Sequence, residues 1–148
     1  MPEHWRRDRG FAQAEAANLA NLHYSTLRDW LAAGPADLVS DRVRGRRWFS
    51  ARDIVVLRLA HELVRGGYVV LTAIAAAFEL VDTIEPGDVI IARNGGISTA
   101  SVRVVKGASL ADMGSTSFIF IPASAIVEAT YAACRLAYFP EEAPHVAV

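Results

Sequence analysis

Residues 22–67 read LHYSTLRDWLAAGPADLVSDRVRGRRWFSARDIVVLRLAHELVRGG, and this stretch decides the expected fold. It opens with a segment, residues 24–33, that is typical of a short amphipathic helix. Leu27, Trp30 and Leu31 follow the i, i+3, i+4 spacing of one helix face, so we expect them to point inward. The helix then presents a mostly polar side to solvent. The side chains on that outward side are Tyr24, Ser25, Thr26 and Arg28.

An arginine-rich hairpin is expected after this helix, which Gly34-Pro35 should end. Residues 38–43 and 46–49 have the composition of two short strands, and a glycine between them permits the positive φ that a tight tip requires. Arginine suits phosphate because its planar fork donates two parallel hydrogen bonds. A helix that contacts base edges beside a hairpin that contacts the phosphate backbone is an arrangement suited to DNA binding. The arginines of the hairpin are Arg42, Arg44, Arg46 and Arg47.

A long buried helix should follow the hairpin. Ser50 is a suitable N-cap and Asp53 takes the third helical position, as in a capping box. The apolar side chains of residues 51–65 cover so wide a face that we expect burial on two sides. Shorter alanine-rich helices are expected at residues 13–22 and 71–81. Together these elements predict a winged helix-turn-helix domain.

The order and spacing of these parts resemble the MerR-type winged-helix DNA-binding domain over residues 11–81. The matching parts are Leu22 with Tyr24-Ser25-Thr26-Leu27-Arg28, the break at Gly34, the 42–49 hairpin, Ser50 with Asp53, and the helix that closes on Gly66-Gly67. The resemblance implies a recognition helix in the major groove, carrying Tyr24, Ser25, Thr26 and Arg28. It also implies a wing whose Arg44, Arg46 and Arg47 contact flanking phosphates. No long heptad-patterned helix follows, although MerR regulators usually dimerise through one, so the family's DNA-distorting mechanism is not carried over.

Charge divides the 148-residue chain into unlike halves. The formal net charge is −1, but residues 1–66 hold 11 arginines against 8 acidic residues, whereas residues 67–148 hold 4 basic against 8 acidic residues. This asymmetry indicates two tasks. Residues 1–10 look like a flexible basic arm without a secretory signal. The most apolar window, residues 68–78, is too short to span a bilayer, so we expect a cytoplasmic, nucleoid-associated protein without membrane contact.

A small α+β domain is expected after the winged helix-turn-helix domain, with the boundary between residues 83 and 84. Strands are expected at residues 88–93, 101–105 and 117–121, with a turn at 94–96 and an exposed loop at 107–116. A broadly apolar helix should occupy residues 123–139. The domain would then end at residue 140, and residues 141–148 should form a disordered tail. Such a small sheet cannot cover the whole apolar helix face, so this domain is expected to form a homodimer. Val127 and Tyr131 are the interface candidates.

No pattern in the sequence indicates catalysis, a metal site or a cofactor. Cys134 is the only cysteine, which excludes an intramolecular disulfide, and its place on a helix face favours a core role. The expected function is sequence-specific binding of double-stranded DNA in transcriptional control, without enzyme activity. Two alternatives stay open: a phage-type DNA-architectural, excisionase or packaging factor, and a DNA-tethered ligand-binding domain. In each case the C-terminal domain would bind a second copy, a protein partner or a small-molecule effector.

Overall fold

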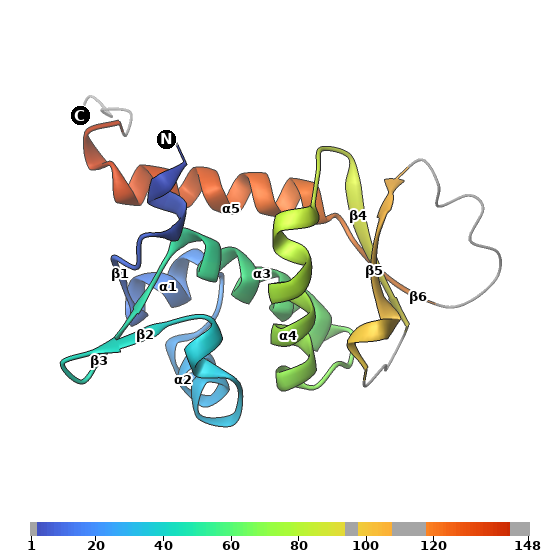
Figure 1. Cartoon of the computed structure of the whole chain (residues 1–148), viewed down its shortest axis with the longest axis horizontal. Coiled ribbons are helices and arrows are strands. Elements are labelled where there is room, and N and C mark those ends of the chain that lie inside the picture. Colours follow the sequence, from blue (N-terminus) through green and yellow to red (C-terminus); the bar gives the residue numbers. More distant parts are fainter. Residues whose placement is uncertain (1–2, 94–97, 108–117, 143–148) are drawn as a thin grey trace.

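One central helix organises the computed structural model, which describes residues 3–93, 98–107 and 118–142. This helix, α3 (Ala51–Arg65), begins at a Ser50 N-cap whose hydroxyl accepts the Asp53 N–H, and the Asp53 carboxylate accepts the Ser50 N–H in return. Two helices, α4 (Val70–Leu80) and α5 (Ala123–Tyr138), pack against it (Figure 1). The expected capping box and the expected burial on two sides are therefore confirmed.

The N-terminal half forms a helix-turn-helix followed by a hairpin. A small antiparallel sheet, ordered β1-β3-β2, ties this hairpin to the segment that precedes the first helix, because Phe11 pairs with Phe49 and Ala12 with Trp48. Arg44 and Gly45 both have positive φ at the hairpin tip, as a tight two-residue turn requires. The elements are β1 (Phe11–Ala12), α1 (Gln13–Leu19), α2 (Tyr24–Ala33), the 3-10 turn η2 (Ala36–Leu38), β2 (Asp41–Val43) and β3 (Arg46–Phe49).

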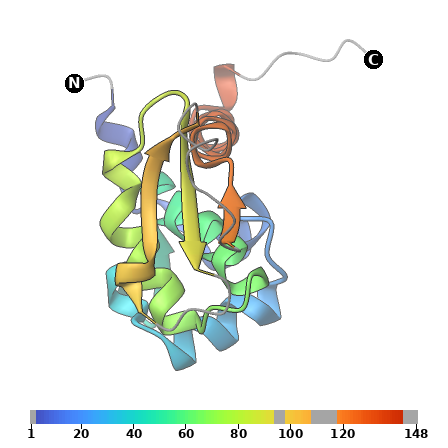
Figure 2. The same cartoon turned by 90° about the vertical axis from the view of Figure 1, so that its right-hand side faces the viewer.

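A second antiparallel sheet lies at the opposite end of the molecule from the hairpin (Figures 1 and 2). Its middle strand, β4, is buried over nearly its whole length, and Ile90 pairs with Val104 on one side and Ile121 on the other. The expected turn at residues 94–96 and nearly all of the expected loop at 107–116 lie outside the described residues. The elements are η3 (Val81–Thr83), β4 (Asp88–Arg93), η4 (Thr99–Ser101), β5 (Val102–Lys106), β6 (Phe118–Ile121) and η6 (Pro140–Glu142).

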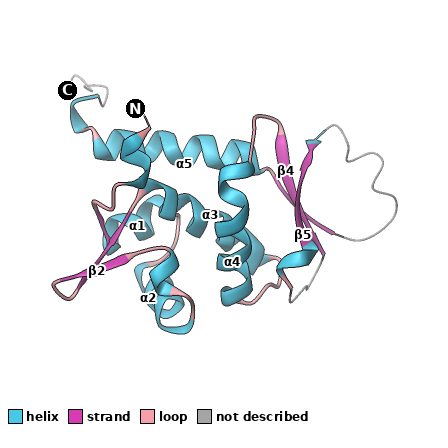
Figure 3. Cartoon of the chain, in the orientation of Figure 1, coloured by secondary structure: helices cyan, strands magenta, loops and turns pink. Residues whose placement is uncertain are grey.

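The two halves share one hydrophobic core. Figure 3 shows α5 running from the second sheet along the helices of the N-terminal half. Buried side chains of α3, of β4 and of α5, such as Leu57, Ile90 and Cys134, belong to the same cluster. The fold class expected from the sequence is confirmed: a helix-turn-helix region followed by a small α+β part with a C-terminal helix. The domain boundary at residue 83 stays a prediction that the two halves have separate functions, because α5 of the C-terminal half packs on α3 of the N-terminal half.

The expectation of a flexible arm over residues 1–10 is wrong for residues 3–10. His4–Arg7 forms a 3-10 turn, η1, and Trp5 is only 6% exposed. The Trp5 ring makes edge contacts with Tyr131 and Phe139 of the C-terminal helix region, at centroid distances of 6.2 and 6.1 Å. Burial of the Trp5 side chain thus orders this segment, although the residues around it in the sequence are charged. Glu141 and Glu142, expected in a disordered tail, belong to the 3-10 turn η6, and Glu142 pairs with Arg135 of α5. The rest of the expected tail lies outside the described residues.

Candidate nucleic-acid interface

The position of α2 follows from the turn before it. Asn21 adopts a left-handed φ of 59°, and Leu22 is buried directly after it, so the chain reverses sharply between α1 and α2. Leu27 and Trp30 are then buried as expected, which turns the opposite side of α2 to solvent. On that side Tyr24, Ser25 and Arg28 are exposed, whereas Thr26 is half-buried.

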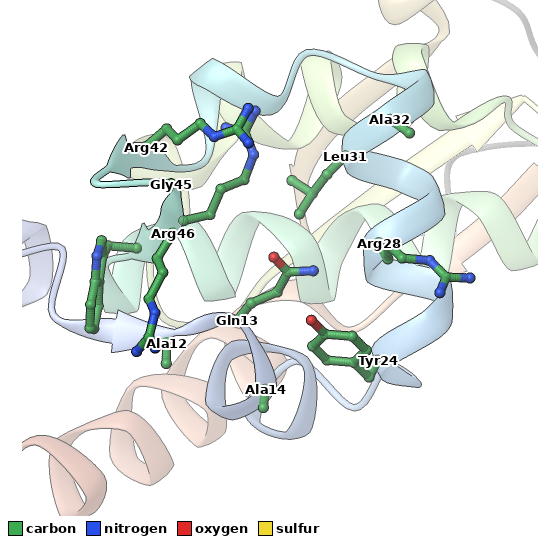
Figure 4. Close-up of a pocket in the computed structure, with 12 residues that line it drawn as sticks. Ala12, Gln13, Ala14, Tyr24, Arg28, Leu31, Ala32, Arg42, Gly45 and Arg46 are labelled. Atoms are coloured by element: carbon green, nitrogen blue, oxygen red, sulfur yellow. The ribbon is translucent and has the colours of Figure 1, made fainter.

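A groove of about 540 Å³ separates α2 from the hairpin, here called the wing (residues 41–49). Figure 4 shows Tyr24 and Leu31 on the α2 side and Arg42 and Arg46 on the wing side. The Arg28 guanidinium extends away from the wing, so it lies at the outer edge of the groove. The groove therefore has a mostly polar helix on one side and cationic side chains on the other.

The four wing arginines have two different environments. Arg42, Arg44 and Arg46 are exposed, and no hydrogen bond or ion pair joins their side chains to another described residue. The Arg47 side chain is only 22% exposed. Its Nη1 donates to Ser40 Oγ at 3.1 Å and lies 3.3 Å from an Asp37 carboxylate oxygen. Three arginines are therefore free to bind an anion, while Arg47 ties the wing to the segment before it.

Two residues that line the groove were missed by the sequence reasoning. Gln13, the first residue of α1, points its amide into the groove between Tyr24 and Arg46 (Figure 4). Trp48 lies half-buried on the wing strand β3 and also lines the groove. Both positions depend on the pairing of β1 with β3, which joins segments far apart in the chain. No local sequence signal indicates that pairing.

The two dimer candidates line a pocket together with Trp5 and Arg6 of the N-terminal segment. Val127 and Tyr131 are half-buried on α5. The Arg6 guanidinium lies 4.1 Å from the centroid of the Tyr131 ring, and burial of Tyr131 raises the pKa of its hydroxyl. Burial also raises the pKa of the Cys134 thiol to about 12, which keeps it protonated at neutral pH. Cys134 is thus a core residue of α5.

Comparison with known proteins assigns the N-terminal half. The model of a family described as MerR HTH family regulatory protein matches residues 12–76, from the end of β1 into α4. Residues 12–76 therefore match a MerR-type helix-turn-helix domain, and the match supports a DNA-binding transcription regulator in general. No curated protein matches the chain. Within the described residues, no helix is long and apolar enough to cross a membrane.

Proposed function

We propose that the chain is a sequence-specific transcription regulator that places α2 in the DNA major groove and holds flanking phosphates with its wing. The observation that carries this proposal is the groove between the exposed side of α2 and the three unpaired arginines Arg42, Arg44 and Arg46. A major groove about 12 Å wide admits a helix of this kind. The wing arginines then lie beside the helix, where the DNA backbone borders the groove.

The geometry supports a division of tasks between the side chains. Ser25 and Thr26 are short, lie in the first turn of α2 and carry hydroxyl groups that bond to base edges in the major groove. Arg28 extends away from the wing, so we expect it to reach the backbone on the other side of α2. Arg47 is bonded to Ser40 and Asp37, so its contribution is to hold the wing.

Binding-site selection from random DNA tests the assignment of α2. The full-length wild-type chain should yield a defined motif, and a Ser25→Ala, Thr26→Ala variant should relax the preference at one or two base pairs. Loss of a base-reading contact costs about 1–3 kcal/mol on the preferred site. Thr99→Ala, at the far end of the molecule in η4, is the matched control and should return the wild-type motif. An unchanged motif at full strength from the double variant would remove α2 from base reading.

We further propose that α5 joins two copies into a homodimer. Ala125, Ala129, Ala132 and Leu136 are exposed at the 4-3-4 spacing of a helix-packing stripe, and Leu136 is 44% exposed. This stripe is more accessible than Val127 and Tyr131, which are half-buried and line a pocket with Trp5 and Arg6. An antiparallel pairing of two α5 helices would place this stripe against the same stripe of the second copy. Such a symmetric dimer would hold two DNA-binding domains at a fixed spacing, which suits a palindromic operator.

A further inference from the structure

The side chain of Arg9 connects three segments at the base of the wing. Its Nε donates to Asp53 Oδ2 at 2.9 Å, and its Nη2 lies 3.4 Å from Asp53 Oδ1. Its Nη1 pairs with Asp41 Oδ1 at 2.9 Å, and Nη2 also donates to the Leu38 carbonyl at 3.3 Å. Asp53 belongs to the first turn of α3, Leu38 precedes the wing, and Asp41 is the first residue of β2. One guanidinium thus links the wing to the central helix.

The α3 end of this linkage is rigid. The Asp53 side chain is only 2% exposed and also accepts the Ser50 N–H at 2.8 Å in the capping box. The hydrogen bond and charge of Asp53 raise the pKa of Arg9, so the guanidinium keeps its positive charge. Arg9 itself is 28% exposed, and all three of its nitrogen atoms are engaged. Its donors are therefore directed at protein groups and away from solvent.

The wing end of the linkage has few other attachments. All three residues of β2, Asp41–Val43, are exposed, and β2 is an edge strand that pairs only with β3. Strand β3 is anchored by its pairing with β1 and by the buried Phe49 side chain. Beyond these, two polar side-chain connections hold the base of the wing within the described residues: Asp41 with Arg9, and Arg47 with Asp37 and Ser40. Among the polar side-chain links, Arg9 is therefore the one that ties the edge strand β2 directly to α3.

We infer that Arg9 is a positioning residue for DNA binding, which fixes the base of the wing against α3 and does not itself contact phosphate. The inference rests on the function proposed above, because it presumes that the wing contacts DNA. It also assigns a role to a basic residue outside the 12–76 region that matches the family model. A lysine at this position would keep the positive charge but lose the planar fork that reaches both carboxylates.

Two variants of the full-length chain separate positioning from charge. Arg9→Lys keeps the charge and removes the fork, so a residue that acts only by charge would tolerate it. Asp41→Asn removes a negative charge near the DNA, so charge alone predicts tighter binding, whereas loss of positioning predicts weaker binding. Arg7→Lys is the matched control: Arg7 lies in the same segment but pairs with Asp82, away from the wing.

The measurements are amide hydrogen exchange of residues 41–49 without DNA, and affinity for DNA by fluorescence anisotropy. Both Arg9→Lys and Asp41→Asn should speed exchange in the wing and weaken binding about tenfold, which is mid-range for residues in one salt-bridge network. The control should change neither. Wild-type affinity for Arg9→Lys, or tighter binding with unchanged wing exchange for Asp41→Asn, would overturn the inference. A wild-type chain that binds no DNA would instead overturn the proposed function.

Discussion

Replacing Trp5 with alanine should strongly destabilise the protein. The side chain is 6% exposed and lies against Tyr131, Tyr138 and Phe139, with ring centroids 5.9 to 6.2 Å away. A buried aromatic side chain removes about 150–250 Å² from water, worth about 4–6 kcal/mol at 25 cal/mol per Å². Because η1 is short and near the surface, neighbours can partly fill the space. We therefore expect a loss of about 3 kcal/mol, at the lower end for such substitutions.

Urea unfolding followed by far-ultraviolet circular dichroism measures this loss without relying on tryptophan fluorescence. A change of this size should also lower the Tm by about 10 °C for a chain of this length. Trp48→Ala is the matched control, because it is the same substitution at a half-buried wing position. It should lower the free energy of unfolding by less than half as much. A free energy of unfolding within about 1 kcal/mol of wild type for Trp5→Ala would show that residues 3–10 are not part of the core.

Three further outcomes are expected. Gly66→Ala places a methyl group on the end of the Ile119 side chain and should cost about 1–3 kcal/mol of unfolding free energy, part of which Ile119→Val should restore. The hydrogen bond from Arg52 lowers the pKa of Asp82, so the stabilisation from this pair is complete above about pH 4–5 and is lost as pH falls through the lowered pKa. The free energy of unfolding of Asp82→Asn, measured as a function of pH, should lack this acid loss. A pH profile identical to that of the wild type would contradict the expectation. Light scattering should show a dimer for the full chain and a monomer for Leu136→Glu, whereas a monomeric wild type would rule out the α5 interface.

The parts of the fold that the sequence predicted depend on local signals. The Ser50–Asp53 capping box gave the start of α3, and the glycine at the wing tip gave the hairpin, because both are properties of a few adjacent residues. The inward face of α2 followed from helical spacing and was confirmed for Leu27 and Trp30, whereas Leu31 is half-buried and lines the groove. Such features need no knowledge of distant segments.

The parts that the sequence did not predict depend on contacts between distant segments. Trp5 is surrounded in the sequence by charged residues, and its apolar packing partner, Tyr131, comes from α5, which is distant in the chain. Arg47 looks like its neighbours in the hairpin, yet Asp37 and Ser40 occupy its donors. The helix α5 was expected from its apolar pattern, but an apolar face fits any partner, so its packing on α3 was not foreseen.

The most direct test of the account is the salt dependence of DNA binding by an Arg44→Ala, Arg46→Ala variant. Both side chains are exposed and unpaired within the described structure, so each is expected to neutralise one phosphate. Fluorescence anisotropy over a range of salt concentrations should show a slope of log K against log salt that is smaller by about 1.8, or 0.9 per lost contact. The weakening should be alike on specific and random DNA. Arg93→Ala, Arg103→Ala, on the exposed surface of the second sheet, is the matched control and should keep the wild-type slope. An unchanged slope for the wing variant, or an equal fall for the control, would contradict a DNA interface at the groove between α2 and the wing.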